Sequence, residues 1–350
     1  MAEQCGSQDS DCGSFEKGDT EDHTLERLRL AAEARLTQGV YEVEVSYGGE
    51  ADLHREKGRC GKNPGHKNFI PSPQFSLTHL PAGFQDKQLL ETIGLCAQLT
   101  VRLVVNYTSM SRPEFLPNSK SAYPFSRFRG KTVPYRFGSG WLFDAFPRGV
   151  LGEGKGGECP CSECGQSGKP SSAWYELMFL TALHVVFDSE ESKATDVELF
   201  YDSDVDRDST VLKLAGGCVE MADIETDGCL LVCWTHDLDL GDKLQALSRQ
   251  RWDLMREINM RYTREERGGL VVVVSHPHGC SKQVTVGWAV DRSDWTGLEV
   301  YRYSADTCPG SSGAGMWPVG WADPDFSILP HSKGVSKGVN ECSPGVVVVD

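Results

Sequence analysis

Three residues of the types that cooperate in nucleophilic catalysis stand far apart in the second half of the chain: His184, Asp227 and Ser312. Ser312 lies in the segment 310–314 (Gly-Ser-Ser-Gly-Ala), where glycine lets the backbone turn tightly and leaves the serine hydroxyl uncovered. Successive N–H groups around such a turn can point at one developing negative charge, as in an oxyanion hole. A histidine could remove the serine proton, and a carboxylate could orient the histidine. Because glycine and serine clusters are more often plain turns, the chemistry depends on all three residues together.

The candidate base and the candidate acid both stand at the ends of predicted strands. His184 lies near the end of an apolar run that is typical of a strand. Asp227 directly precedes the apolar segment 228–234, so its charge would lie at the edge of the core. Asp223 and Asp237 are alternative acids, but neither stands at the entry to a strand. Asp227 is therefore the preferred acid.

These residues give the chain a resemblance to the trypsin-like (chymotrypsin-fold) serine peptidases. Segment 181–184 (Thr-Ala-Leu-His) is similar to their T-A-x-H box, 227–231 (Asp-Gly-Cys-Leu-Leu) to their D-x-A-L-L box, and 310–314 to their G-D-S-G-G box. The order His, Asp, Ser also matches. The separations, 43 residues from histidine to aspartate and 85 from aspartate to serine, suit a triad divided between two barrels. Segment 137–143 is similar to the family's G-S-G strand, so the resemblance covers about residues 92–345.

The resemblance implies a mainly β fold of two six-stranded antiparallel β-barrels, with an N-terminal helical and disordered extension and a helical insertion. It also implies a serine endopeptidase that hydrolyses peptide bonds through an acyl-enzyme. Ser312 would be the nucleophile, His184 the general base and acid, and Asp227 the group that orients the imidazole. The backbone N–H groups of Gly310 and Ser312 would form the oxyanion hole. The alternative is an inactive peptidase-fold protein that serves as a binding module or scaffold.

One departure from the family pattern concerns activation. Secreted trypsins carry an aspartate just before the nucleophile, where it pairs with a new N-terminal amine, whereas this chain has Ser311. An Ile-Val-Gly-Gly-like segment before the first barrel strand is also missing from the sequence. We therefore expect a site that is formed without proteolytic processing.

Two segments could line the pocket for P1, the side chain just before the cleaved bond. Asp306 stands six residues before Ser312, where the resembled trypsins carry an aspartate that binds Arg or Lys. Segment 331–334 (His-Ser-Lys-Gly) is similar to the H-x-x-G segment of relatives that prefer Glu or Gln, which implicates His331 and Gly334. A carboxylate selects cations, whereas an imidazole favours acids or amides. Both P1 classes stay open, and Asp306 could equally be a solvated turn residue.

Composition limits the partners of the chain. The formal net charge of −15 argues against nonspecific binding to nucleic acid or to an anionic membrane. The first residues lack a basic region followed by an apolar stretch, so we expect no secretory signal and an intracellular, cytoplasmic protein. The apolar runs are too short for a membrane span. The expected partner is a protein or peptide substrate.

The 13 cysteines are expected to be reduced thiols, since their number is odd and the chain is long. Catalysis by the triad requires no cofactor. Cys159, Cys161 and Cys164 nevertheless stand close enough to bind one structural Zn²⁺. A fourth ligand would have to come from a distant residue, such as Cys218 or a histidine. The alternative is a flexible loop with free thiols.

The chain is expected to divide into an N-terminal extension, residues 1–91, and a peptidase domain, residues 92–350. The extension would comprise an acidic disordered tail over about 1–22, an amphipathic helix over 24–36 and a linker over 47–75. A further short helix is predicted over 85–95 and the first barrel strand over 98–106. Charged residues with apolar side chains at helical spacing predict the helical insertion over 238–262.

Overall fold

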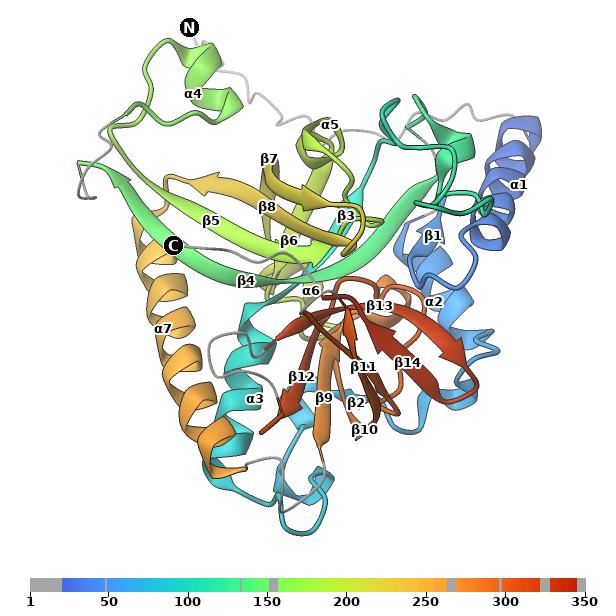
Figure 1. Cartoon of the computed structure of the whole chain (residues 1–350). Helices are drawn as coiled ribbons and strands as arrows, with labels where there is room; N and C mark the ends of the chain where they lie inside the picture. Colours follow the sequence, from blue (N-terminus) through green and yellow to red (C-terminus); the bar gives the residue numbers. More distant parts are fainter. Residues whose placement is uncertain are drawn as a thin grey trace, which may run out of the picture.

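The computed structural model describes residues 21–47, 49–132, 134–150, 157–262, 269–295, 298–321 and 328–344 of the chain. Within these residues, almost every strand pairs antiparallel with its neighbours, and the strands form two separate sheets. Figure 1 shows the two sheets stacked, the one formed by the middle of the chain above the one formed by its later part. The predicted acidic tail lies almost entirely in residues 1–20, outside the described residues.

The first sheet closes on itself as a barrel. Its strand order is β1-β4-β3-β6-β7-β8-β5, and an additional pairing of β4 with β5 joins the ends of the six strands β3 to β8. The three-residue β1 lies outside the ring, paired with the long β4. The strands are β1 (Glu44–Ser46), β3 (Thr100–Val105), β4 (Tyr135–Gly149), β5 (Ala173–Ala182), β6 (Thr195–Leu199), β7 (Leu212–Asp223) and β8 (Gly228–Thr235).

The second sheet closes in the same way. Its order is β11-β14-β13-β12-β9-β10-β2, and β11 also pairs with β10, so that the six strands β9 to β14 form a ring with β2 added outside. The prediction of two six-stranded antiparallel barrels is therefore confirmed. The strands are β2 (Ile70–Pro71), β9 (Leu270–Ser275), β10 (Gln283–Trp295), β11 (Leu298–Tyr303), β12 (Gly315–Val319), β13 (Leu329–Ser336) and β14 (Val339–Cys342).

Strand β9 illustrates why the barrels need helices around them. All six of its residues are buried. Val271 and Val273 point into the second barrel, where they pack with Tyr301 and other buried residues. Val272 and Val274 point out of it, into an apolar cluster that also contains side chains of α3 and α7. Because side chains alternate along a strand, a continuous apolar run of this kind requires cover on both faces.

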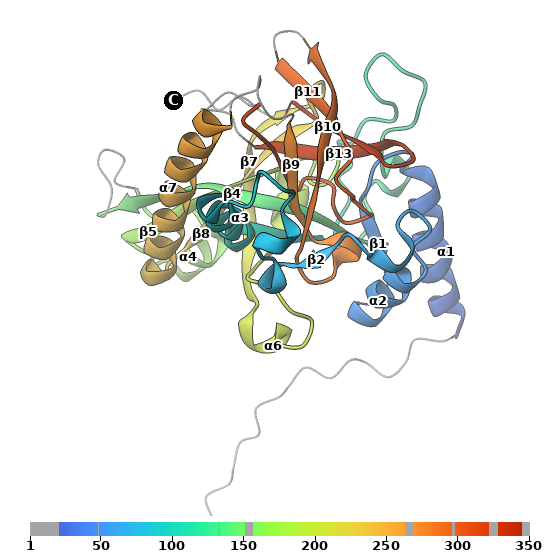
Figure 2. The same ribbon diagram turned by 90° about the horizontal axis from the view of Figure 1, so that it is seen from below.

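The helices α3 and α7 supply that cover and lie side by side along one flank of the barrels (Figures 1 and 2). The predicted helical insertion is confirmed as α7, which begins at Leu238. The side chain of the preceding residue, Asp237, caps the helix by accepting a hydrogen bond from the N–H of Leu240. The predicted helices over 24–36 and 85–95 correspond to α1 and α3. The α-helices are α1 (Glu21–Thr37), α2 (Glu50–Gly58), α3 (Lys87–Leu99), α4 (Ser162–Ser167), α5 (Ser189–Lys193), α6 (Arg207–Thr210) and α7 (Leu238–Arg261); the short 3-10 helices are η1 (Pro64–His66), η2 (Ser72–Gln74), η3 (Leu77–His79), η4 (Ser126–Phe128) and η5 (Pro277–Gly279). In the described parts of the chain, no helix is long and apolar enough to cross a membrane.

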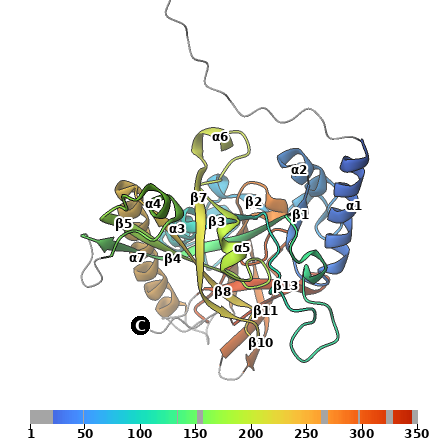
Figure 3. The ribbon, with the colours of Figure 1, turned by 90° about the horizontal axis from the view of Figure 1, so that it is seen from above.

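The N-terminal region packs on both barrels. Helices α1 and α2 lie on the flank opposite α7 (Figure 3). Strand β1 pairs with β4 of the first barrel, and β2 pairs with β10 of the second. The prediction of a linker over 47–75 is therefore wrong. Strands of two or three residues give no periodic signal in sequence, and their stability comes from the barrel edges on which they pair.

Candidate active site

The structure brings the three predicted catalytic residues together from both barrels. His184 follows β5, Asp227 lies in the turn between β7 and β8, and Ser312 lies in the loop between β11 and β12. The Oγ of Ser312 is 2.7 Å from Nε2 of His184. The Nδ1 of the same imidazole is 2.8 Å from Oδ2 and 3.0 Å from Oδ1 of Asp227. This is the geometry in which a histidine can accept the serine proton while a carboxylate fixes its tautomer.

Asp227 is held in the charged form that this role requires. Burial alone would raise the pKa of its carboxyl, but the imidazole of His184 and the hydroxyl of Ser332 outweigh that effect, and the pKa is lowered. The backbone N–H of His184 also donates to Oδ1, at 3.0 Å. A carboxylate can only accept hydrogen bonds, so Nδ1 of His184 carries the proton and Nε2 is left to accept one from Ser312.

The alternative acids have other functions in the fold. The carboxylate of Asp223 accepts a hydrogen bond from the N–H of Glu225 within its own turn. Asp237 caps the N-terminus of α7. Neither contacts His184 among the described hydrogen bonds, which supports the choice of Asp227.

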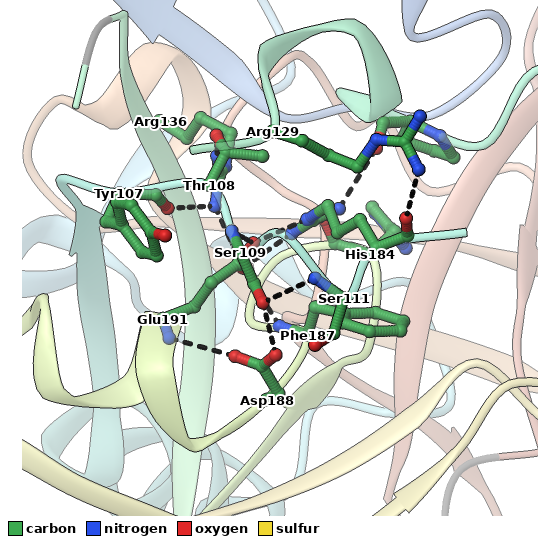
Figure 4. A network of polar contacts seen from close by, with 12 residues as sticks. Tyr107, Thr108, Ser109, Ser111, Arg129, Arg136, His184, Phe187, Asp188 and Glu191 are labelled. Carbon is green, nitrogen blue, oxygen red and sulfur yellow. Dashed lines mark hydrogen bonds and ion pairs between the residues drawn. The ribbon is translucent and has the colours of Figure 1, made fainter. Parts of the chain in front are cut away.

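A buried ion network fixes the backbone around His184, and Figure 4 shows much of it. Arg112 donates through both terminal nitrogens to the carbonyl oxygen of His184, each at 3.1 Å. Glu191 binds Arg112 at 2.6 Å and Arg136 at 2.9 Å, with all three side chains almost fully buried. Burial raises the pKa of Glu191, but the two guanidinium groups lower it overall to about 2. The network therefore remains charged. It holds the backbone of His184 in place just after the end of β5.

The turn before Ser312 carries the two N–H groups that the sequence analysis assigns to an oxyanion hole. The N–H groups of Gly310 and Ser312 converge on one oxygen atom, the carbonyl oxygen of Glu42, at 2.7 and 3.1 Å. Gly310 has a φ of 94°, and a Cβ at this position would lie only 2.4 Å from the carbonyl oxygen of His276. Glycine is therefore required here for both its backbone conformation and its close packing.

Neutral hydrogen bonds hold this turn where secreted trypsins use an aspartate. Ser311 is fully buried, donates to the hydroxyl of Ser275 at 3.1 Å and accepts from the N–H of Cys308 at 3.2 Å. These hydrogen bonds hold the turn without a charged partner for Ser311.

His331, which the sequence analysis assigns to the P1 pocket, contacts a side chain of the protein itself, Glu42. Its Oε2 lies 2.8 Å from Nε2 of His331, and its Oε1 contacts Nζ of Lys62. The Nδ1 of His331 is 2.6 Å from the hydroxyl of Tyr303. A carboxylate can only accept hydrogen bonds, so Nε2 of His331 carries a proton and donates it to Glu42. Burial lowers the pKa of His331, which favours the neutral ring, and its Nδ1 then accepts a hydrogen bond from the Tyr303 hydroxyl. The group formed by His331 and Lys62 therefore binds a carboxylate in this structure.

Of the predicted pocket residues, His331 and Gly334 lie at this site and Asp306 does not. The N–H of Gly334 donates to the carbonyl of Val40 at 3.1 Å. The carboxylate of Asp306 accepts a hydrogen bond from Asn68 in an exposed contact. The pocket contact belongs to the next residue, Thr307, whose hydroxyl is 3.0 Å from Nζ of Lys62. The assignment of Asp306 as a pocket floor for basic side chains is therefore corrected, because the two residues of a dipeptide direct their side chains differently.

Two closed six-stranded barrels that contribute Ser312, His184 and Asp227 to one site decide the architecture. The chain has the fold of trypsin-like serine peptidases.

No protein-family model and no curated protein matches the sequence. Among solved structures, the chain is similar to the HtrA-type protease AlgW with a decapeptide, at 17% identity and a TM-score of 0.38, over 73% of this chain and 62% of that one. It is also similar to the Rv3671c protease from M. tuberculosis, at 14% identity and a TM-score of 0.35, over 74% and 82% of the two chains. The chain thus spans less than two thirds of the HtrA-type structure, and the assignment of the fold depends on the strand topology alone.

A candidate metal centre lies at the edge of the first barrel, away from the triad. The sulfur atoms of Cys159, Cys161 and Cys164 surround Nε2 of His236, at 3.1, 3.6 and 3.3 Å. Ligands of one tetrahedral Zn²⁺ lie about 3.6 Å apart when a sulfur faces a nitrogen. The four atoms therefore fit one zinc ion. Cys218 lies outside this group, and the fourth residue is the histidine that directly follows β8.

A second group of the same kind was not indicated by the sequence. Cys60, His66, His278 and Cys308 place one ligand atom each within 4.8 Å of the others. Cys60 and Cys308 are separated by 248 residues, and their sulfur atoms lie 3.6 Å apart. Neither the C-x-C spacing nor a paired-histidine motif occurs here, so only the fold reveals the group.

Proposed function

We propose that the protein is a serine endopeptidase that hydrolyses peptide bonds in protein or peptide substrates through an acyl-enzyme. The observation that carries this proposal is the combination of the hydrogen-bonded series Ser312, His184 and Asp227 with two N–H groups that converge on one carbonyl oxygen. Nucleophile, base, orienting acid and oxyanion donors are then present in one site. Each has a defined role in acyl transfer.

The reaction would begin when Ser312 Oγ attacks the scissile carbonyl carbon and His184 Nε2 takes its proton. The N–H groups of Gly310 and Ser312 would stabilise the negative charge on the carbonyl oxygen, and loss of one such donor typically costs about 3 kcal/mol of transition-state stabilisation. The imidazolium would then protonate the leaving amine, with its charge balanced by Asp227. A water molecule, deprotonated by His184, would hydrolyse the acyl-enzyme and release Ser312.

An inactive binding or scaffold protein is the second candidate. The observation in its favour is that the chain's own Glu42 fills both the oxyanion hole and the P1 pocket. The complete triad favours the peptidase, since a scaffold has no need of a serine hydroxyl 2.7 Å from an imidazole.

The two candidates are separated by turnover of an unfolded protein substrate. Full-length wild-type protein is compared with Ser312→Ala and with the control Ser209→Ala, which alters an exposed serine far from Ser312 in the sequence. The peptidase proposal expects cleavage by the wild type and the control, and a loss of several orders of magnitude with Ser312→Ala. Equal residual cleavage by all three proteins, also when Glu42 is replaced by alanine in each of them, would favour the scaffold.

We further propose a structural zinc ion at Cys159, Cys161, Cys164 and His236. The fit of the four ligand atoms supports it, and the ion would tie the loop before β5 to the end of β8. Thiolate ligands require reduced cysteines, and every cysteine among the described residues is a free thiol, which suits a protein of a reducing, intracellular compartment. Metal analysis of protein purified under reducing conditions should show zinc that decreases by one equivalent in Cys164→Ser. Unchanged metal content in that variant would contradict this site.

A further inference from the structure

Residues 40–42 lie in the candidate active site as a peptide substrate would. Tyr41 forms an antiparallel bridge with Lys333 of β13, and Val40 accepts a hydrogen bond from the N–H of Gly334. An extended peptide that adds to an exposed strand edge gains such main-chain hydrogen bonds, while its side chains enter pockets. The carbonyl oxygen of Glu42 occupies the oxyanion hole, so Glu42 stands at P1, Tyr41 at P2 and Val40 at P3.

The side chains agree with this register. The ring of Tyr41 packs against the imidazole of His184, with 4.4 Å between ring centroids. The Glu42 carboxylate is buried between His331 and Lys62. Burial raises the pKa of Glu42, but these two partners lower it overall to about 2. A buried carboxylate is tolerated only where such donors receive it. The pocket therefore complements an acidic P1 residue.

Two contacts keep the Glu42–Val43 bond unreactive. The N–H of Glu42 donates to Oγ of Ser312 at 3.0 Å, which engages one of the two lone pairs of this oxygen and lowers its nucleophilicity. The N–H of Val43 donates to Oε1 of Gln38 at 3.1 Å, and the Val43 side chain is fully buried. The amine that cleavage would release is thus held in place, where it can re-form the bond.

We propose that residues 40–42 are an intramolecular pseudosubstrate, which inhibits the peptidase until it is displaced and which shows that the site accepts Glu at P1. This inference rests on the proposed peptidase function. Its substrate class is a peptide or protein with an accessible glutamate before the cleaved bond. The segment connects α1 to β1, so a partner that pulls on α1 would withdraw Glu42 from the pocket.

The test compares full-length wild type with Glu42→Ala and with the control Glu33→Ala, a glutamate of helix α1, which precedes the segment. Two quantities are measured: the rate of labelling of Ser312 by a small fluorophosphonate, and kcat/KM on matched peptides with Glu, Gln or Arg at P1. We expect Glu42→Ala to raise both quantities at least tenfold, with Glu preferred over Gln and Arg, and Glu33→Ala to match the wild type. Tyr41→Ala is a second variant that should also raise both, since it removes the contact with His184 but leaves the pocket intact.

Each other outcome has a defined meaning. Equal labelling of the wild type and both variants would overturn the inhibition and leave the peptidase function standing. Labelling of none of them would contradict the proposed function itself. Wild-type protein that is cut between Glu42 and Val43 would show that the segment is a substrate, and it would overturn the assignment of residues 40–42 as an inhibitor. A preference for Arg at P1 would overturn the assignment of the pocket.

A separate observation concerns the group formed by Cys60, His66, His278 and Cys308. The Sγ atoms of the two cysteines lie 3.6 Å apart, close to the about 3.8 Å expected for two thiolates on one tetrahedral Zn²⁺. The Nε2 of His66 is 3.6 Å from Sγ of Cys308, also as expected for such ligands. Donors of types Cys₂His₂ are the usual set for a closed structural zinc site.

The surroundings of the four ligands are those of a metal centre. Glu44 binds Nδ1 of His278 at 2.8 Å, and the buried Nε2 of the same ring has no hydrogen-bond partner in the described residues. A histidine that binds zinc through one ring nitrogen commonly donates the N–H of its other ring nitrogen to a carboxylate. Asn63 donates to both sulfur atoms, through its backbone N–H to Cys60 at 3.4 Å and through Nδ2 to Cys308 at 3.3 Å.

The geometry points to a second structural zinc site, formed by Cys60, His66, His278 and Cys308. It would join the segment that carries Lys62 of the P1 pocket to Cys308, which stands two residues before Gly310. The test measures zinc per chain in Cys164→Ser, which lacks a ligand of the first site, and in the double variant Cys60→Ser, Cys164→Ser. Substitution with Co²⁺ in Cys164→Ser should give the absorption bands of a tetrahedral site with two thiolates.

We expect one equivalent of zinc in Cys164→Ser and a loss of most of it in the double variant. Equal zinc in the two proteins, or none in Cys164→Ser, would overturn the site. A mass lower by two hydrogens without reductant, with Cys60 and Cys308 found in one disulfide-linked peptide, would also overturn it. The control Cys96→Ser, a cysteine outside both groups, should leave the metal content unchanged.

Discussion

The hydroxyl of Ser332 donates a hydrogen bond of 2.9 Å to Oδ2 of Asp227, the same oxygen that Nδ1 of His184 contacts at 2.8 Å. Ser332 lies on β13 of the second barrel, whereas the other two residues belong to the first. This hydrogen bond therefore aligns the acid of the triad with the barrel that carries the nucleophile. A hydrogen bond to a charged group contributes about 1.5–3 kcal/mol.

Ser332→Ala is expected to lower kcat/KM on a peptide with Glu at P1 by about tenfold or more, which corresponds to about 1.4 kcal/mol. The lost hydrogen bond leaves Asp227 less well oriented and raises its pKa. The control is Ser336→Ala, which changes an exposed serine of the same strand. Equal rates for the two variants would show that the interbarrel hydrogen bond has no effect on the triad.

Asp227→Asn is expected to reduce kcat by about four orders of magnitude, because an amide that donates to Nδ1 would favour the wrong tautomer of His184. The matched substitution Asp223→Asn affects only a local turn and should leave kcat within a few-fold of the wild type. Steady-state kinetics on the same peptide decide this point. A large loss in Asp223→Asn with little in Asp227→Asn would reassign the acid.

Gly310→Ala is expected to reduce kcat/KM by 10²–10³-fold or more, since a Cβ would collide with the carbonyl of His276 and displace one oxyanion donor. Gly338→Ala is the control: it also has a positive φ, 73°, but its Cβ would meet nothing within 4 Å. Backbone strain is common to both variants, so their difference in activity isolates the oxyanion hole. Thermal unfolding of both proteins checks that Gly310→Ala is folded. Undiminished activity in that variant would contradict the assignment.

Glu191→Gln is expected to lower the free energy of unfolding at pH 7 by about 3–5 kcal/mol, because it leaves Arg112 and Arg136 buried without a countercharge. The pKa of Glu191 is lowered from 4.5 to about 2. Its contribution is therefore complete above about pH 4.5 and is lost as the pH falls toward 2. Urea unfolding at pH 7, 4 and 3 should show the difference from the wild type narrowing with acid.

The control for this network is Glu190→Gln, at the exposed neighbouring position. It should change the free energy of unfolding by less than about 1 kcal/mol at every pH. A difference between wild type and Glu191→Gln that stays constant from pH 7 to pH 3 would mean that the carboxylate is not the source of the stability.

The three triad positions were predictable from the sequence because their motifs are local, and the two barrels were predictable only through the family resemblance that these motifs carry. Apolar alternation identifies strands, and the boxes around His184, Asp227 and Ser312 are short and contiguous. The contact between Glu42 and His331 joins residues 289 positions apart, and nothing in the sequence near residue 42 distinguishes this buried glutamate from the exposed acids of the chain. A pocket that is filled by the chain itself can be found only from the fold.

The metal ligands likewise include some that the sequence predicts and one that only the fold identifies. Cys159, Cys161 and Cys164 form a local cluster that sequence reasoning detects, and His236 could have been suggested by its place at the end of a strand.

Asp306 was assigned by its distance from Ser312, but such counting cannot resolve which of two neighbouring residues points into a pocket. Here the hydroxyl of Thr307 does so.

The central claim is that Ser312 is an activated nucleophile. The most direct measurement is mass spectrometry of the full-length Glu42→Ala variant after reaction with a fluorophosphonate, with fragmentation to locate the adduct. The account predicts one adduct per chain, on Ser312, which is absent when His184 is also replaced by alanine. Failure of this folded variant to form the adduct, or equal adduct formation without His184, would contradict it.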